Sequence, residues 1–187
     1  MKLKTEIRAR DAVMACFPEA SVGCEIGVHL GIHARELLLA VRPAMLHLID
    51  PWQAVADSAH AGSWYDNVDQ EEMDRYCLAV SESLEEQIRG GSVKIHRKTS
   101  AAAMPGFADN SLDWVYVDGD HSHAAVTLDL ALSYAKTKPG GFIAGDDYQR
   151  DGWWGDGILR AVHHFLATKP VKMHLVMDDQ FVIEKLA

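Results

Sequence analysis

Short apolar segments alternate with longer amphipathic segments along most of this chain. The apolar segments are residues 21–27, 44–50, 92–97, 112–120 and 140–147. The amphipathic segments are residues 33–41, 69–88, 124–137 and 156–168. Short apolar runs bounded by turn residues indicate buried strands, and apolar residues at helical spacing indicate helices. This alternation predicts an α/β protein with a mostly parallel sheet that is covered by helices on both faces.

The two ends of the sequence depart from this alternation. Residues 171–186 form two apolar segments joined at Asp178-Asp179, which predicts a β-hairpin. The first segment, "MKLKTEIRARDAVMACF", is typical of an amphipathic helix that ends before Pro18. With 187 residues and no repeat or linker, residues 1–187 are predicted to form a single domain.

Composition limits the partners of the chain. No apolar run approaches the roughly 20 residues of a membrane span, so we expect no membrane partner. The formal charge of -9 argues against a nucleic-acid partner. Three widely spaced cysteines form no CxxC pair, which favours a reduced, cytoplasmic location. Homo-oligomer formation stays open.

Acidic residues follow four of the predicted strands. They are Glu25, Asp50, Asp118 with Asp120, and the adjacent pair Asp146 and Asp147. The carboxyl ends of parallel strands lie at one edge of the sheet, where ligands of this fold class bind. A single Asp in such a place is as often a turn or capping residue. Six acids together indicate a ligand site, and Asp146 beside Asp147 requires a cation or water to offset the repulsion.

The first strand runs into the turn "EIGVHLG", residues 25–31. Glycines there let the backbone approach a ligand closely, although the full GxGxxG pattern of dinucleotide folds is lacking. Asp50, at the end of the second strand, is placed to accept both hydroxyls of a ribose. The sequence therefore predicts a cofactor that contains a nucleoside.

Four motifs carry a resemblance to a known family: "EIGVHLG", "LIDPW", "LDWVYVDGDHSH" and "GGFIAGDDY". With them the chain resembles the class I S-adenosylmethionine-dependent methyltransferases from Val22 to Lys185. Within that class it resembles small members with the DGDH and GDDY motifs and macrocin-type sugar O-methyltransferases. The resemblance implies a Rossmann-like doubly wound sheet of seven strands, with an antiparallel strand of the C-terminal hairpin inserted between strands five and six.

The same resemblance implies roles for individual residues. The residues that would border S-adenosylmethionine are Glu25, Gly27 and Gly31 at the methionine part, Asp50 and Trp52 at the ribose, Thr99 and Ser100 near the adenine, and Asp118 facing the methyl group. Macrocin-type and catechol-type enzymes also imply that Asp118, Asp146 and Asp147 hold Mg²⁺ or Ca²⁺. Such a metal would lower the pKa of an acceptor hydroxyl, and Asp120 or His121 would take its proton. A site without metal is the open alternative.

The expected function is therefore O-methylation of a small molecule. One alternative is a nicotinamide-dependent oxidoreductase on a Rossmann domain, which the terminal hairpin disfavours. Another is a non-catalytic module that keeps a cofactor-binding fold, because fold alone does not fix function. Trp64 and Tyr65, in the long loop over residues 52–67, would either cover the site or pin the loop to the core.

Overall fold

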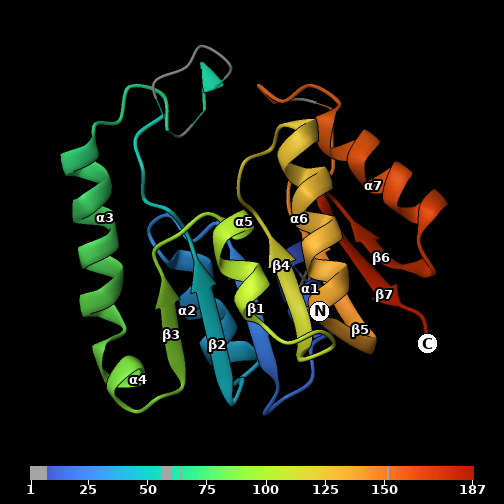
Figure 1. Cartoon of the computed structure of the whole chain (residues 1–187), viewed down its shortest axis with the longest axis horizontal. Helices are drawn as coiled ribbons and strands as arrows, with labels where there is room; N and C mark the ends of the chain where they lie inside the picture. Colours follow the sequence, from blue (N-terminus) through green and yellow to red (C-terminus); the bar gives the residue numbers. More distant parts are fainter. Residues whose placement is uncertain (1–7, 56–59, 64, 151) are drawn as a thin grey trace, which may run out of the picture.

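This computed structural model describes residues 8–55, 60–63, 65–150 and 152–187. Seven strands form a single sheet in the order β3-β2-β1-β4-β5-β7-β6 (Figure 1). Their bounds are β1 (Val22–Ile26), β2 (Met45–Ile49), β3 (Val93–His96), β4 (Leu112–Val117), β5 (Thr137–Gly145), β6 (Val171–Met177) and β7 (Gln180–Lys185). The strand order reverses between β1 and β4, and this is the place where such sheets bind ligands.

The C-terminal hairpin is built into the sheet as predicted. Strands β1 to β5 pair in parallel, whereas β7 pairs antiparallel with both β5 and β6. Ala144 of β5 lies opposite Val182, and Gly145 lies opposite Phe181. The prediction of a seven-stranded, mostly parallel sheet with an antiparallel strand beside strand five is confirmed.

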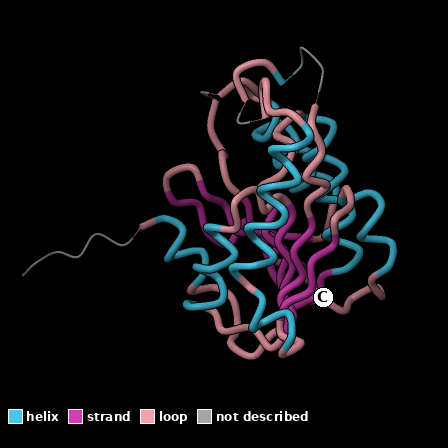
Figure 2. The backbone as a smooth tube through the Cα atoms, turned by 90° about the vertical axis from the view of Figure 1, so that its left-hand side faces the viewer, coloured by secondary structure: helices cyan, strands magenta, loops and turns pink. Residues whose placement is uncertain are grey.

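Helices cover both faces of the sheet, as Figure 2 shows from the side. The helices are α1 (Ala9–Met14), α2 (Ile32–Ala40), α3 (Gln70–Ser83), α4 (Glu85–Arg89), α5 (Ser100–Ala103), α6 (His123–Lys136) and α7 (Gly157–Thr168), with a 3-10 turn over Met104–Gly106. Buried residues of α1, α2 and α3 share one apolar cluster, and those of α5, α6 and α7 share the other. None of the helices that the structure describes is long and apolar enough to cross a membrane.

Successive side chains of β4 point to opposite faces of the sheet and so belong to two different apolar cores. Trp114 and Tyr116 belong to the cluster under α1 and α2, whereas Val115 and Val117 belong to the cluster under α6 and α7. Trp114 also stacks on Phe17, with ring centroids 4.4 Å apart. This contact anchors the segment after α1 to the middle of the sheet, and it positions α1 beside the strand ends.

Several element bounds differ from the sequence prediction. The predicted helix over 69–88 is interrupted at Leu84, where φ is −116°, and so becomes α3 and α4. Strand β5 begins at Thr137, because the Pro139-Gly140-Gly141 segment is an irregularity within the strand rather than a turn before it. The four-residue helix α5 was not predicted. Residues 1–7 of the predicted first helix lie outside the described residues.

Candidate active site

Two cavities open at the carboxyl ends of β1, β2 and β4. The larger cavity has a volume of about 550 Å³. The residues that line it include Ile26, Asp50, Trp52, Ser100, Asp120 and Asp129. The second, which we call the acidic cavity, has about 400 Å³ and is lined by Arg10, Glu25, His33, Asp118, His121, Asp146 and Asp147 among others. Gly27, His29 and Tyr65 line both, so the turn after β1 separates the two spaces.

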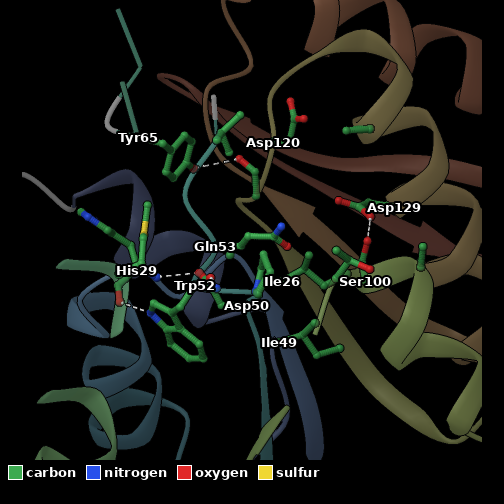
Figure 3. Close-up of a pocket in the computed structure, with 18 of the residues that line it drawn as sticks. Ile26, His29, Ile49, Asp50, Trp52, Gln53, Tyr65, Ser100, Asp120 and Asp129 are labelled. Carbon is green, nitrogen blue, oxygen red and sulfur yellow. Dashed lines mark hydrogen bonds between the residues drawn. The ribbon is translucent and has the colours of Figure 1, made fainter. Parts of the chain in front are cut away.

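Asp50 fixes the shape of the turn after β1. Its Oδ2 accepts hydrogen bonds from the backbone N–H groups of Val28, at 2.9 Å, and His29, at 3.0 Å. Its Oδ1 accepts from the backbone N–H of Trp52 at 2.7 Å. In Figure 3, Asp50, Trp52 and His29 lie together at one side of the larger cavity. The carboxylate predicted to hold a ribose therefore also holds the loop that would surround it.

Gly27 can only be glycine in this arrangement. Its φ is +89°, and a Cβ atom built on it would lie 2.0 Å from the carbonyl oxygen of Asp118. Its N–H donates to the carbonyl of Ile49 at 2.9 Å. The ends of β1, β2 and β4 are thus brought into contact by one residue without a side chain. Gly31, with φ of +67°, stands at the N-terminus of α2.

The opposite side of the larger cavity has a buried acid that sequence reasoning missed. Thr99 and Ser100 stand at the start of α5, and the Ser100 hydroxyl donates to Oδ1 of Asp129 from α6 (Figure 3). Asp129 is 4% exposed, and burial raises the pKa of its carboxyl to about 6. The available signal was a single carboxylate within the apolar segment "AAVTLDLAL".

Glu25 is the most deeply buried acid of the acidic cavity. Its Oε1 lies 3.1 Å from Nδ1 of His33, which comes from α2. Burial raises the pKa of Glu25, and the contact with His33 and the charge of Arg10 only partly oppose this rise. Among the described residues, Glu25 Oε2 and His33 Nε2 have no hydrogen-bond partner. Two unsatisfied polar atoms in a cavity wall indicate that a ligand completes them.

Asp146 is surrounded by donors from three parts of the chain. Its Oδ2 accepts from Nη2 of Arg10, and its Oδ1 accepts from Nε2 of Gln180 and from the backbone N–H of Asp147 at 2.8 Å. The same Arg10 nitrogen lies 3.5 Å from Asp118. Burial, followed by repulsion from Asp146, raises the pKa of Asp118. Sequence reasoning missed Arg10, because no local pattern shows which cation meets the strand ends.

His121 and Asp147 form a close pair. His121 Nε2 lies 2.6 Å from Oδ2 of Asp147 and 3.7 Å from Asp118. The centroid of the Trp154 ring lies 4.8 Å from that of His121, so the indole packs against the imidazole. Burial lowers the pKa of His121, but the hydrogen bond to Asp147 and the charge of Asp118 outweigh it, so the pKa is raised. His121 Nδ1 has no partner among the described residues.

Asp120 is placed apart from His121. It lines the larger cavity, where its Oδ2 lies 3.0 Å from Nε2 of His60 and its Oδ1 accepts from the Ser122 N–H at 2.8 Å. The Tyr65 hydroxyl donates to the carbonyl of Gly119 at 3.3 Å, so the loop after β2 is tied to this turn. Trp64 lies outside the described residues. Of the two large cavities, Asp120 thus lines one and His121 lines the other.

Among the described residues, side-chain atoms that could bind a metal ion form two groups. Asp118, His121 and Asp147 form one group, and Asp146, Asp147 and Asp179 form another, with the atoms of each group within 4.8 Å of one another. The predicted metal ligands Asp118, Asp146 and Asp147 are therefore divided between two groups. His121 and Asp179 were not predicted as their companions.

Comparison with known proteins gives a family match. The model of a family described as "Methyltransferase domain" matches residues 24–148. A curated protein of Acanthamoeba polyphaga mimivirus, described as uncharacterised, is 38% identical over 58 residues. Those residues span 31% of this chain and 26% of the viral protein.

Solved structures agree with the fold. The O-methyltransferase TomG of Streptomyces achromogenes, in complex with S-adenosylmethionine, has a TM-score of 0.64 at 15% identity, covering 95% of this chain and 77% of TomG. A Streptococcus mutans protein in complex with S-adenosylhomocysteine has a TM-score of 0.65 at 13% identity, covering 95% and 96%. A tRNA methyltransferase of B. subtilis has a TM-score of 0.59 at 9% identity, covering 97% and 68%.

Proposed function

This chain belongs to the methyltransferase-domain family, and from that premise we propose that it transfers the methyl group of S-adenosylmethionine to a hydroxyl group of a small molecule. The observation that carries the proposal is the pair of cavities that meet at Gly27. One has the size and apolar lining of a nucleoside site, and the other contains a buried histidine beside a carboxylate.

The larger cavity suits the adenosine part of the cofactor. Ile26 and Ile49 supply apolar surface, Asp50 stands at one side, and Ser100 with Asp129 stands at the other. The Asp129 carboxyl, which is 4% exposed, could form a hydrogen bond with a donor or acceptor on the edge of the adenine. Thr99 and Trp52 also line this cavity, which supports the proposal that they contact the cofactor.

The acidic cavity suits the charged part of the cofactor and the acceptor. Glu25 Oε2 is an unsatisfied buried acceptor, which suits the ammonium group of the methionine moiety. Asp118 contributes negative charge near the turn at Gly27, which favours a sulfonium cation. When bound, S-adenosylmethionine supplies an electrophilic methyl group. The chain contributes orientation of the two reactants, which lowers the entropic part of the barrier to transfer.

His121 is the candidate general base. Asp147 orients its ring and stabilises the imidazolium that forms when it accepts a proton. Its pKa is raised by Asp147 and Asp118, so proton uptake is favourable. Asp120 is the weaker candidate, since the Ser122 N–H and His60 keep its pKa below the usual value despite burial. A hydroxyl acceptor needs such a base, and an O-methyltransferase, TomG, is among the similar structures.

Metal assistance stays a prediction, and the residues present do not fit the predicted ligand set. Both oxygens of Asp146 already accept hydrogen bonds, one of them from Arg10, which also faces Asp118. A divalent cation bound by Asp118 and Asp146 would have to displace the guanidinium. We therefore derive no step of the transfer from a metal.

The acceptor is proposed to be small. The cavity that contains His121 has about 400 Å³, and the net charge of -9 disfavours a nucleic-acid substrate. The sugar acceptors of macrocin-type enzymes carry several hydroxyl groups, and carboxylate and imidazole side chains can form hydrogen bonds with such groups.

A calorimetric titration with S-adenosylhomocysteine and, in parallel, with NAD tests the cofactor. We expect binding of the first and none of the second. Transfer of a labelled methyl group to a panel of sugars, phenols and other small alcohols then tests the reaction, with unmodified tRNA as a further acceptor. Binding of NAD alone, or transfer only to tRNA, would contradict the proposal.

A further inference from the structure

Arg10 lies where two strand-end carboxylates face each other. It belongs to α1, and its Nη2 atom bonds Asp146 and lies 3.5 Å from Asp118. Its side chain is 34% exposed, so the guanidinium is partly withdrawn from water. Helix α1 holds it there, because Val13 and Met14 are buried in the core beneath the helix.

The surrounding hydrogen bonds leave Asp146 without a free oxygen. Gln180, from β7, donates to the oxygen that Arg10 does not use. The backbone N–H of Asp147 donates to that same oxygen. Asp147 is in turn engaged by His121. Each of the three predicted metal ligands thus faces a basic side chain of the chain itself.

We propose that the Arg10 guanidinium is the resident cation of this site and excludes divalent metal ions from Asp118 and Asp146. A guanidinium keeps its charge at all working pH values and binds carboxylates as a planar donor. It therefore offsets the repulsion between neighbouring carboxylates, as a bound Mg²⁺ would. Removal of Arg10 should expose two facing carboxylates and create a divalent-cation site between Asp118 and Asp146. This inference goes beyond the proposed transfer reaction and does not depend on it.

Thermal melts in the absence of any cofactor test the proposal. The proteins are the native chain, Arg10→Ala, and the double variant Arg10→Ala with Asp146→Asn, each with chelator or with millimolar Mg²⁺ or Mn²⁺. Arg8→Ala is the matched control. Arg8 is a neighbouring arginine at the start of the same helix, and it pairs with Asp11 and Glu36 away from the acidic cavity.

A ligand that binds only the folded state raises the melting temperature. We expect no metal-dependent rise in the native chain or in Arg8→Ala, a rise of several degrees in Arg10→Ala, and its loss in the double variant. Direct titration with Mn²⁺ should show binding at least tenfold tighter to Arg10→Ala than to the native chain.

An equal metal-dependent rise in the native chain and in Arg10→Ala would overturn the proposal, because Arg10 would then exclude nothing. No rise in a folded Arg10→Ala would overturn it equally. If Arg10→Ala folds only when metal is present, and the double variant does not, the proposal is supported. If Arg10→Ala folds under neither condition, Arg10→Gln, a shorter uncharged side chain that keeps two N–H donors, undergoes the same melts and is held to the same two outcomes.

Discussion

The acidic side chains of the site are held in place mainly by donors of the chain itself. Asp50 accepts three backbone N–H groups, Asp146 accepts from Arg10 and Gln180, and Asp147 pairs with His121. The identity of the acids was predictable, because each follows an apolar strand. Their partners Arg10 and Gln180 were not, because they are 136 and 34 residues from Asp146 along the chain.

Asp50→Asn tests the double role of this residue. The amide nitrogen cannot accept the N–H groups that an oxygen of Asp50 now accepts, so the turn after β1 should loosen. We expect the free energy of unfolding to fall by about 1–3 kcal/mol, the usual cost of an unmet buried hydrogen bond. Calorimetry should also show weaker binding of S-adenosylhomocysteine. Unchanged stability together with weaker binding would assign Asp50 to the ligand alone.

His121 predicts a pH dependence of the reaction. A general base must be neutral, so the transfer rate should rise with pH as His121 loses its proton at its raised pKa. Asp147→Asn removes a cause of that rise, so the midpoint of the rate profile should move to lower pH. His164→Ala, which changes an exposed histidine of α7, is the control and should leave the midpoint in place. An identical midpoint in Asp147→Asn would exclude the pair as the base.

The same pair affects stability with a defined sign. The folded-state pKa of His121 is raised above the ordinary value of 6.5, so the pairing stabilises the fold fully below that pH. This contribution is lost as the pH rises through the raised pKa. Denaturant melts over that range should show a decrease in the native chain that is absent in His121→Ala. A pH-independent difference between the two proteins would contradict this assignment.

At the scale of strands and helices, most of the fold could be predicted from the sequence. The five parallel strands and the hairpin follow apolar runs, and the turn at Asp178-Asp179 is where it was expected. Helix α5 was not predictable, because "SAAA" is too short to show a helical period. The break at Leu84 was hidden within a continuous helical pattern, because the tertiary fold rather than local preference sets that φ angle.

Gly27→Ala should separate the ends of β1 and β4. The new methyl group would overlap the Asp118 carbonyl in a backbone conformation that already disfavours a side chain. We expect a loss of stability clearly greater than the roughly 1–2 kcal/mol of the backbone conformation alone. Gly91→Ala is the matched control, since its φ is +78° and nothing lies within 4 Å of the added atom. Equal losses in the two variants, measured by denaturant unfolding, would show that the contact at Gly27 is unimportant.

At the scale of the whole molecule, the two cavities lie at one edge of the sheet, where the strand order reverses. Helix α1, the loop after β2 and strand β7 all reach this edge through Arg10, Tyr65 and Gln180. A ligand bound there contacts segments from distant parts of the chain. Ligand binding should therefore stabilise the whole fold rather than one segment of it.

The cofactor should stabilise the entire domain. At a concentration about 100 times its dissociation constant, S-adenosylhomocysteine should add about 2.7 kcal/mol to the free energy of unfolding. A thermal melt with increasing ligand measures this as a single transition that moves to higher temperature. NAD at the same concentrations should have no effect. Two separate transitions, only one of which responds, would show that part of the chain unfolds independently of the site.

The meeting of Arg10 and Gln180 on Asp146 has a consequence for biosynthesis. Arg10 is translated before all five parallel strands, whereas Gln180 is translated after them. Until then the nascent chain has a β5 without its antiparallel neighbour and an aspartate without one of its donors. Contacts between segments far apart in the sequence form slowly, because the entropy of loop closure must be lost before they can stabilise the fold. The acidic cavity should therefore be assembled late, so that an unfinished polypeptide captures no cofactor.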